Sequence, residues 1–272
     1  MPKSEATPNR YEQIIAQLFA IHFKTNQPAD AAVDFSREEC VAVAQVLGIE
    51  LPKNLGDVFY SFRYRNPLPE SIRATAAPGL EWVIEGAGRA RYRFRQVRIN
   101  RIEPRAEMLA IKVPDATPEI ITAYALTDEQ ALLAKVRYNR LIDLFLGITA
   151  YSLQNHLRTT VKNLGQIEID EIYVGVDRHG RQFVVPVQAK GGNDKHGSVQ
   201  TVQDIRCCAE KFPHLICRAV SAQFVGKKQI ALFELTALDG EVKVIDERHY
   251  HLVPAAEISI DDLRNYAQRG TA

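Results

Sequence analysis

The stretch Gln166–Lys190, QIEIDEIYVGVDRHGRQFVVPVQAK, decides how the second half of the chain folds. Two apolar runs flank the polar centre DRHGRQ, a pattern typical of two strands joined by a turn. The outer ends of these runs carry polar side chains at alternate positions, namely Glu168, Asp170, Gln188 and Lys190. Polar groups are costly to bury without partners, so four of them in an otherwise apolar hairpin indicate a function.

The register of this hairpin decides whether the four side chains meet. If the turn centres on His179, the numbers of two paired residues add up to twice 179. Asp170 then lies opposite Gln188, and Glu168 lies opposite Lys190. Because side chains alternate between the two faces of a strand, all four share one face. A register shifted by one residue would separate them.

Two carboxylates, an amide and an ammonium in one patch suit phosphodiester hydrolysis. A pair of carboxylates binds a hard cation such as Mg²⁺. A lysine beside it orients water or shifts its proton, while the metal neutralises charge. The alternative interpretation is a set of cross-strand salt bridges, Glu168–Lys190 among them, which contribute little on an exposed strand. The apolar neighbouring segments IYVG and VVPV favour the functional site.

The order E-I-D, hairpin, Q-A-K resembles the PD-(D/E)XK nuclease superfamily, which has the restriction-endonuclease-like fold. The resemblance covers residues 127–253. It implies that Asp170 binds a metal, that Gln188 fills a position usually held by Asp or Glu, and that Lys190 is the catalytic lysine. It further implies Mg²⁺ as the cofactor, with Mn²⁺ as a possible substitute, and double-stranded DNA as the substrate.

Two positions depart from the family pattern. Ile169 replaces the proline that often precedes the aspartate, and Gln188 replaces a carboxylate. An amide oxygen binds a metal without adding charge; Mrr-like nucleases have a similar Q-x-K, and Glu168 is a third candidate metal ligand. We therefore expect Gln188→Glu to be tolerated. The segment before the hairpin, residues 150–164, has no acid, and Glu129 is too far upstream to assign.

The sequence around the hairpin predicts an α/β domain over residues 126–272. Residues 127–148 and 150–164 have helical character, and a further helix is expected from Ser198 to about Lys211. The strands ICRAVSAQF, QIALFELT and EVKVIDERHYHLV follow. This order predicts a mixed sheet flanked by helices. The polar loop GGNDKHGS is expected to be mobile and close to the site.

The first part of the chain predicts a separate, mostly helical, winged-helix-like domain over residues 1–125. Apolar residues of 10–23 recur at helical spacing, Ser36 and Glu39 form a capping box, and Asn54 caps a third helix. The segment GLEWVIEGAGRARYRFRQV then reads as two strands around a Gly-Ala-Gly turn. Residues 100–125 contain three prolines and read as a linker with short extended pieces.

The second strand of this N-terminal hairpin predicts a DNA-binding surface. Six arginines and no acid stand between Gly86 and Ile102. Four of them alternate with Ala90, Tyr92 and Phe94, so one strand face would be guanidinium: Arg89, Arg91, Arg93 and Arg95. Guanidiniums match phosphate oxygens and release counterions on binding DNA. The alternative is a solvated face balanced by nearby acids.

Three further residues extend this expectation. Arg63 and Arg65 would enlarge the basic patch, and Gln200 would contact DNA near the scissile bond. Each is also typical of an ordinary surface side chain.

Composition limits the function classes. The chain has 272 residues and a net charge of +1, so a nucleic-acid surface must be local. It has no apolar run of about 18 residues and no secretory leader, so no membrane partner is expected. Four cysteines make a poor disulfide framework and indicate a reducing, cytoplasmic setting. Cys207, Cys208, His214 and Cys217 lack paired C-x-x-C knuckles, so buried thiols are expected rather than zinc.

The sequence therefore predicts a metal-dependent DNA endonuclease of restriction type. The nuclease resemblance further implies a homodimer, with a cognate methyltransferase as a possible partner in the same system. Two alternatives remain. One is a modification-dependent or repair nuclease; the other is a non-catalytic DNA-binding regulator with a degenerate nuclease domain.

Overall fold

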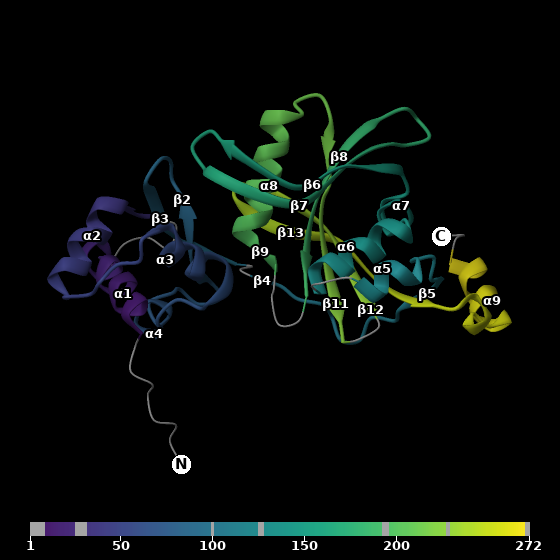
Figure 1. Cartoon of the computed structure of the whole chain (residues 1–272), viewed down its shortest axis with the longest axis horizontal. Helices are drawn as coiled ribbons and strands as arrows, with labels where there is room; N and C mark the ends of the chain where they lie inside the picture. Colours follow the sequence, from purple (N-terminus) through teal and green to yellow (C-terminus); the bar gives the residue numbers. More distant parts are fainter. Residues whose placement is uncertain are drawn as a thin grey trace, which may run out of the picture. The chain divides into compact units, whose positions relative to one another are not determined.

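The computed structural model describes residues 9–24, 32–98, 101–124, 128–191, 196–226 and 229–269 (Figure 1). The chain forms two compact units. The first contains residues 1–101, 159–167 and 197–203, and the second contains residues 102–158, 168–196 and 204–272. The expected division into residues 1–125 and 126–272 stays a prediction.

The first unit combines short helices with a three-stranded antiparallel sheet. In chain order its elements are α1 (Arg10–His22), β1 (Val33–Ser36), α2 (Arg37–Val46), α3 (Gly56–Tyr60), the π-helix η1 (Ser61–Arg65), α4 (Glu70–Arg73), β2 (Glu81–Gly86) and β3 (Arg91–Val97). The strand order is β1-β3-β2. Strand β1 was not expected, because it is only four residues long and leads directly into α2.

Local sequence explains where these helices begin. Ser36 and Glu39 exchange side-chain-to-backbone hydrogen bonds of 2.7 and 3.2 Å, which confirms the predicted capping box. Asn9 and Glu12 form a second capping box at α1. The buried faces of the helices pack on the sheet through aromatic residues, including Phe19, Phe35 and Phe94.

The second unit is built mainly on a curled mixed sheet flanked by helices. Residues 159–161 and 165–167 of that sheet, and residues 198–203 of one helix, fall in the first unit. Its strands are β5 (Ile111–Pro114), β6 (Thr149–Val161), β7 (Gly165–Val176), β8 (Gln182–Lys190), β10 (Ile216–Cys217), β11 (Ala219–Val225), β12 (Gln229–Leu238) and β13 (Glu241–Val253). The strand order is β5-β13-β12-β11-β8-β7-β6, and β10 pairs with β8. β8 and β11 run parallel, as do β13 and β5. Thus β5, from the stretch expected to be a linker, is part of the sheet.

Helices accompany this sheet. They are α5 (Glu119–Tyr124), α6 (Asp128–Tyr138), α7 (Leu141–Leu146), α8 (Ser198–Lys211) and α9 (Ile260–Arg269). α6 and α7 bury apolar side chains against one face, where Val187 and Ala189 of β8 lie. α8 connects the parallel strands β8 and β11 and meets the opposite face through Asp204, which contacts Gln188. The expected helix Ser198–Lys211 and the three strands after it are confirmed.

One expected element is wrong. Residues 150–164, predicted to be helical, form most of β6 and the turn that follows it. Leu153, Leu157 and Val161 are spaced by four, which fits a helical repeat and also places them on one face of a strand. The β-branched run Thr159–Val161 favours the strand. Most of β6 is exposed, so burial does not distinguish the two periods.

Two short β-strands, β4 (Arg101–Ile102) and β9 (His196–Gly197), and the 3₁₀ helix η2 (Ala255–Glu257) complete the elements of the described residues. No helix in this described part of the chain has the length and apolar character needed to cross a membrane.

Candidate functional site

The β7–β8 hairpin has the predicted register. Regular pairing runs from Val176 opposite Gln182 to Glu171 opposite Val187, and in every pair the numbers add up to twice 179. Beyond this point side chains take part in the hydrogen bonding between the strands. The Ala189 N–H donates to Asp170 Oδ2 over 2.8 Å, and Gln188 Nε2 donates to the Glu168 carbonyl over 3.1 Å.

The amide of Gln188 is oriented by two acceptors. Its Nε2 also donates to Asp204 Oδ2 of α8 over 3.1 Å. Because only the nitrogen of an amide donates, these two bonds fix which way the group points. The oxygen Oε1 is the atom left to accept a proton donor or a cation. Gln188 and Asp204 are both buried, with 1% and 2% of their surface exposed.

Asp204 is a member of this site that the sequence did not reveal. Burial raises its pKa well above the ordinary aspartate value, although the hydrogen bond from Gln188 opposes that shift. The negative charge of Asp170 raises it further. The available signal was an acid four residues before the buried Cys208, on the inward face of a helix. The sequence does not show which strand that helix face covers, so it could not assign a partner residue to Asp204.

Asp170 and Lys190 form the charged part of the site. Burial raises the pKa of Asp170, while the positive charge of Lys190 and the Ala189 N–H oppose the shift. The Lys190 side chain is 14% exposed, and its Nζ lies 3.9 Å from Glu129 Oε1. Glu129 is on α6, so the helix supplies the acid that seemed too distant along the chain. A carboxyl group with a raised pKa is one that a nearby cation would stabilise in its charged form.

Glu168 points to a different set of partners. Its carboxylate lies 3.2 Å from Arg158 Nε and 3.6 Å from His156 Nδ1, both on β6. The expected alternative pair Glu168–Lys190 is therefore replaced by contacts with β6. Glu168 joins the site through its backbone carbonyl, which accepts from Gln188. Its proposed role as a metal ligand stays a prediction.

The donor atoms are compatible with Mg²⁺ or Mn²⁺ but do not form a closed protein cage. Among the described residues, no three His, Cys, Asp or Glu side chains gather as a metal-binding group. Mg²⁺ usually keeps several waters and needs only one or two carboxylates together with substrate phosphate. Asp170 and the Oε1 atom of Gln188 fit that limited requirement.

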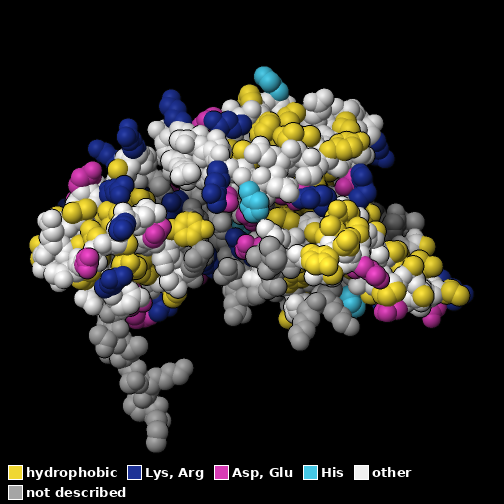
Figure 2. All heavy atoms as spheres, in the orientation of Figure 1, with side chains coloured by type: hydrophobic (Ala, Val, Ile, Leu, Met, Phe, Trp, Pro, Cys, Tyr) yellow, Lys and Arg dark blue, Asp and Glu magenta, His cyan; other side chains and the backbone are white. Residues whose placement is uncertain are grey.

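The N-terminal arginine surface differs from its prediction. Arg93 forms two hydrogen bonds of 2.5 and 2.9 Å with Asp34 of β1, and Arg95 lies 3.3 Å from Glu85 of β2. Arg89 lies in the turn before β3 rather than on the strand, and Arg91 is exposed. The face is therefore not purely basic, because neighbouring strands supply acids that one strand's sequence does not show. Figure 2 shows acidic side chains among the basic ones over this unit.

Two of the remaining predicted DNA contacts, Arg63 and Gln200, have buried polar atoms. Arg63 lies on η1 with Nε and Nη2 buried. The side chain of Arg65, at the end of η1, lies outside the described residues. Gln200 is in the first turn of α8, and its Oε1 is buried without a hydrogen-bond partner among the described residues.

The expectation of buried thiols is confirmed for Cys207 and Cys208, whereas Cys217 is partly exposed. Cys207 and Cys208 are buried, and burial helps raise the pKa of Cys207 to about 11. His249 is buried, and its Nε2 lies 2.8 Å from Glu247 Oε1. The register of β13 against β12 turns both residues toward the same covered face. Half of the loop GGNDKHGS, residues 192–195, lies outside the described residues.

Comparisons of the whole chain with protein-family models, with curated proteins and with solved structures find no match.

Proposed function

We propose that the chain is a metal-dependent endonuclease that hydrolyses phosphodiester bonds in double-stranded DNA. The observation that carries the proposal is that Asp170, Gln188 and Lys190 lie just beyond the last regular β7–β8 pair, Glu171–Val187. There Asp170 accepts from the Ala189 N–H, and the charge of Lys190 acts on its carboxylate. The order α6, β6–β7–β8, α8 and then the parallel strand β11 also supports it. That order is the helix, hairpin, helix and strand succession which the nuclease resemblance implies.

Each residue has a distinct task in this proposal. The Ala189 N–H holds the Asp170 carboxylate, and Asp204 holds the amide of Gln188, so two oxygen donors are directed by the protein. A divalent cation bound there would supply charge neutralisation for the scissile phosphate. Lys190 would hold and polarise the attacking water, and Glu129 would keep its ammonium positioned.

The N-terminal unit would bind the duplex as a winged helix. The short helices α1 to α4 and a three-stranded sheet in the order β1-β3-β2 support this proposal. Arg91 and Arg89, which are exposed, would contact phosphates, while Arg93 is already held by Asp34. A homodimer would cut both strands of a palindromic site, and a methyltransferase would protect the host sequence.

A second function has its own support. The amide of Gln188 and the absence of a three-acid group among the described residues also suit a non-catalytic DNA-binding regulator. A repair or modification-dependent nuclease would use the same site on a different substrate.

The test is cleavage of supercoiled plasmid with Mg²⁺, with Mn²⁺ and with EDTA. We expect Asp170→Asn to lose metal binding and cleavage together. Lys190→Ala should lose cleavage but keep most DNA binding in Ca²⁺. Lys211→Ala is the matched control, because that lysine is exposed and pairs with Glu210. Comparing methylated with unmethylated plasmid separates the nuclease classes. A folded Lys190→Ala protein that cuts at the normal rate would contradict the proposal.

A further inference from the structure

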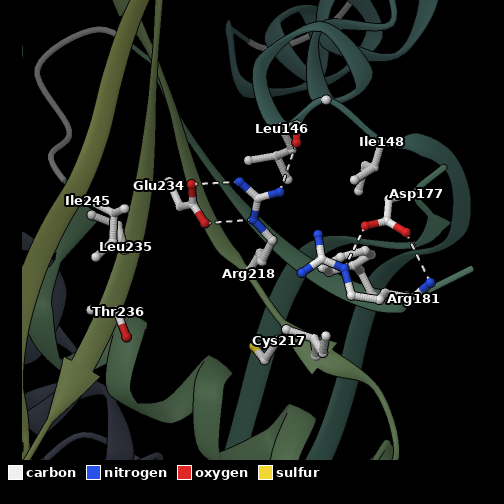
Figure 3. A pocket seen from close by; sticks show the side chains of 13 residues that line it. Leu146, Ile148, Asp177, Arg181, Cys217, Arg218, Glu234, Leu235, Thr236 and Ile245 are labelled. Atoms are coloured by element: carbon white, nitrogen blue, oxygen red, sulfur yellow. Dashed lines mark hydrogen bonds and ion pairs between the residues drawn. The ribbon is translucent and has the colours of Figure 1, made fainter. Parts of the chain in front are cut away.

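A cavity of about 510 Å³ opens at the turn end of the β7–β8 hairpin (Figure 3). It lies away from the proposed nuclease site, because Asp177 follows Asp170 by seven residues along an extended strand, roughly 23 Å at about 3.3 Å per residue. Its volume falls within the range of about 300–1,000 Å³ that is usual for small-molecule sites. The cavity is not used by the proposed nuclease chemistry.

The acids in this cavity are covered by their own partners. Asp177 is 7% exposed and accepts from the Arg181 Nε over 2.6 Å and from two backbone N–H groups of the turn. Glu234 is 15% exposed and accepts two bonds, of 2.6 and 2.8 Å, from Arg218. Arg218 also donates to the Leu146 carbonyl, so its guanidinium is held on both sides.

Arg181 is the exposed charge of the cavity. Its side chain is 62% exposed, and only its Nε is engaged by Asp177. Its two terminal nitrogens have no hydrogen bond or ion pair with any residue in the described ranges. In Figure 3 the Arg181 guanidinium extends from Asp177 toward Arg218. The cavity thus presents the terminal N–H donors of Arg181 beside two arginine–carboxylate ion pairs.

The remaining wall is apolar. Both guanidinium carbons lie 5.8 Å from the centre of the buried Phe183 ring. Leu146, Ile148 and Leu235 continue the wall, and Ile216 and Ile245 at the rim are 46% and 59% exposed. One charged edge beside an apolar wall is the arrangement that orients an amphiphilic ligand.

We propose that this cavity binds a carboxylate group attached to an apolar body. The two terminal nitrogens of Arg181 match the two oxygens of a planar carboxylate in forked geometry. A single negative charge suits the site better than a phosphate dianion, because Asp177 and Glu234 lie in the same cavity and repel excess charge. The carboxylate has two possible sources, a free aliphatic acid or the C-terminus of an apolar peptide.

The test is calorimetric titration of the full-length protein with octanoate, octanol, octyl phosphate and a short peptide ending in leucine, with a free or amidated C-terminus. We expect saturable binding of octanoate or of the free-acid peptide, and weaker binding of octanol, octyl phosphate and the amide. Whichever carboxylate binds identifies the source.

Variants connect the binding to the named residue. Arg181→Gln should weaken binding of the carboxylate ligand by about tenfold or more, because a charge-assisted hydrogen-bonded pair is lost. Arg181→Lys should recover only part of the lost affinity, since lysine keeps the positive charge but cannot donate two parallel hydrogen bonds to the carboxylate. Arg178→Gln, in the same turn and outside the cavity lining, is the matched control.

Three outcomes would overturn the proposal. They are no saturable binding of either carboxylate, equal affinity in Arg181→Gln, and tighter binding of the phosphate than of the carboxylate. A circular dichroism melt confirms that each variant is folded. None of these measurements depends on DNA cleavage, so failure of this proposal and failure of the nuclease proposal are distinguishable.

Discussion

Gln188 is the residue at which sequence and structure lead to different predictions. From the sequence alone, Gln188→Glu adds a metal ligand and should be tolerated. In the structure the amide nitrogen donates to Asp204 and to the Glu168 carbonyl, and a carboxylate cannot donate. Gln188→Glu should therefore lower the free energy of unfolding by about 2–4 kcal/mol at pH 7, because the Glu168 carbonyl loses its donor and a second carboxyl group is buried beside Asp204.

A second change, at Asp204, should restore the stability lost in Gln188→Glu. Asp204→Asn supplies an amide that can donate to the introduced carboxylate, so the double change should recover much of the stability lost. Urea unfolding of both single variants and the double variant measures this coupling. Strictly additive losses would show that the two side chains do not depend on each other.

Asp204 also predicts a pH dependence of stability. Its pKa is raised in the folded protein, so its carboxyl group binds a proton more tightly there than in the unfolded chain. That contribution is fully present below the ordinary aspartate pKa and is lost as pH rises toward the folded pKa. Asp204→Asn should thus gain stability relative to the native protein as pH increases above about 4, by up to about 1.4 kcal/mol per pH unit.

Urea unfolding between pH 4 and pH 8 checks this expectation. Asp261→Asn, at an exposed aspartate of α9, serves as the control. A constant difference between Asp204→Asn and the native protein over this range would rule out a buried titrating carboxyl at Asp204.

At the scale of elements, strand β3 gives a graded prediction for DNA binding. Arg91 is exposed, whereas Arg93 is held by two hydrogen bonds to Asp34. Arg91→Ala should reduce the slope of log affinity against log salt by about 0.9, the value for one phosphate contact. Arg93→Ala should change the slope less, since a phosphate must compete with Asp34. The measurement is duplex binding over a range of salt concentrations, with Arg178→Ala as the control.

Equal slopes for Arg91→Ala and the native protein would remove β3 from the DNA surface. A larger effect of Arg93→Ala than of Arg91→Ala would instead mean that DNA displaces Asp34 from Arg93.

Individual elements show which parts of the structure could be predicted from the sequence. The hairpin register followed from period two and one turn, both local properties, and so did the capping box of α2. β6 was predicted to be a helix because apolar residues spaced by four lie on one face of a helix and also on one face of a strand. Glu129 and Asp204 were missed because each reaches the site from a helix whose packing face is set by tertiary contacts. The acids facing Arg93 and Arg95 were missed for the same reason, since they belong to neighbouring strands.

At the scale of the whole molecule, the strand β5 changes the expected pattern of proteolysis. Residues 111–114 pair with the end of β13 and so are protected within the sheet. Residues 103–110 precede β5 and include Leu109, which is 75% exposed. Limited chymotrypsin digestion should therefore cleave after Leu109 before it cleaves inside β5 or β13. Mass spectrometry of the first fragments identifies the site. A first cut within residues 128–191 would contradict the expected order of protection.

The distance along the chain between β5 and its partner also matters while the protein is being made. Arg105, just before β5, and Glu247 of β13 are 142 residues apart in sequence, yet they are joined by hydrogen bonds of 2.9 and 2.6 Å. Translation adds about 5–20 residues per second, so β5 leaves the ribosome roughly 7–28 s before the strand it pairs with. During that interval the nascent sheet has an open edge. The sheet is therefore complete only after β13, the last of its strands among the described residues, has emerged.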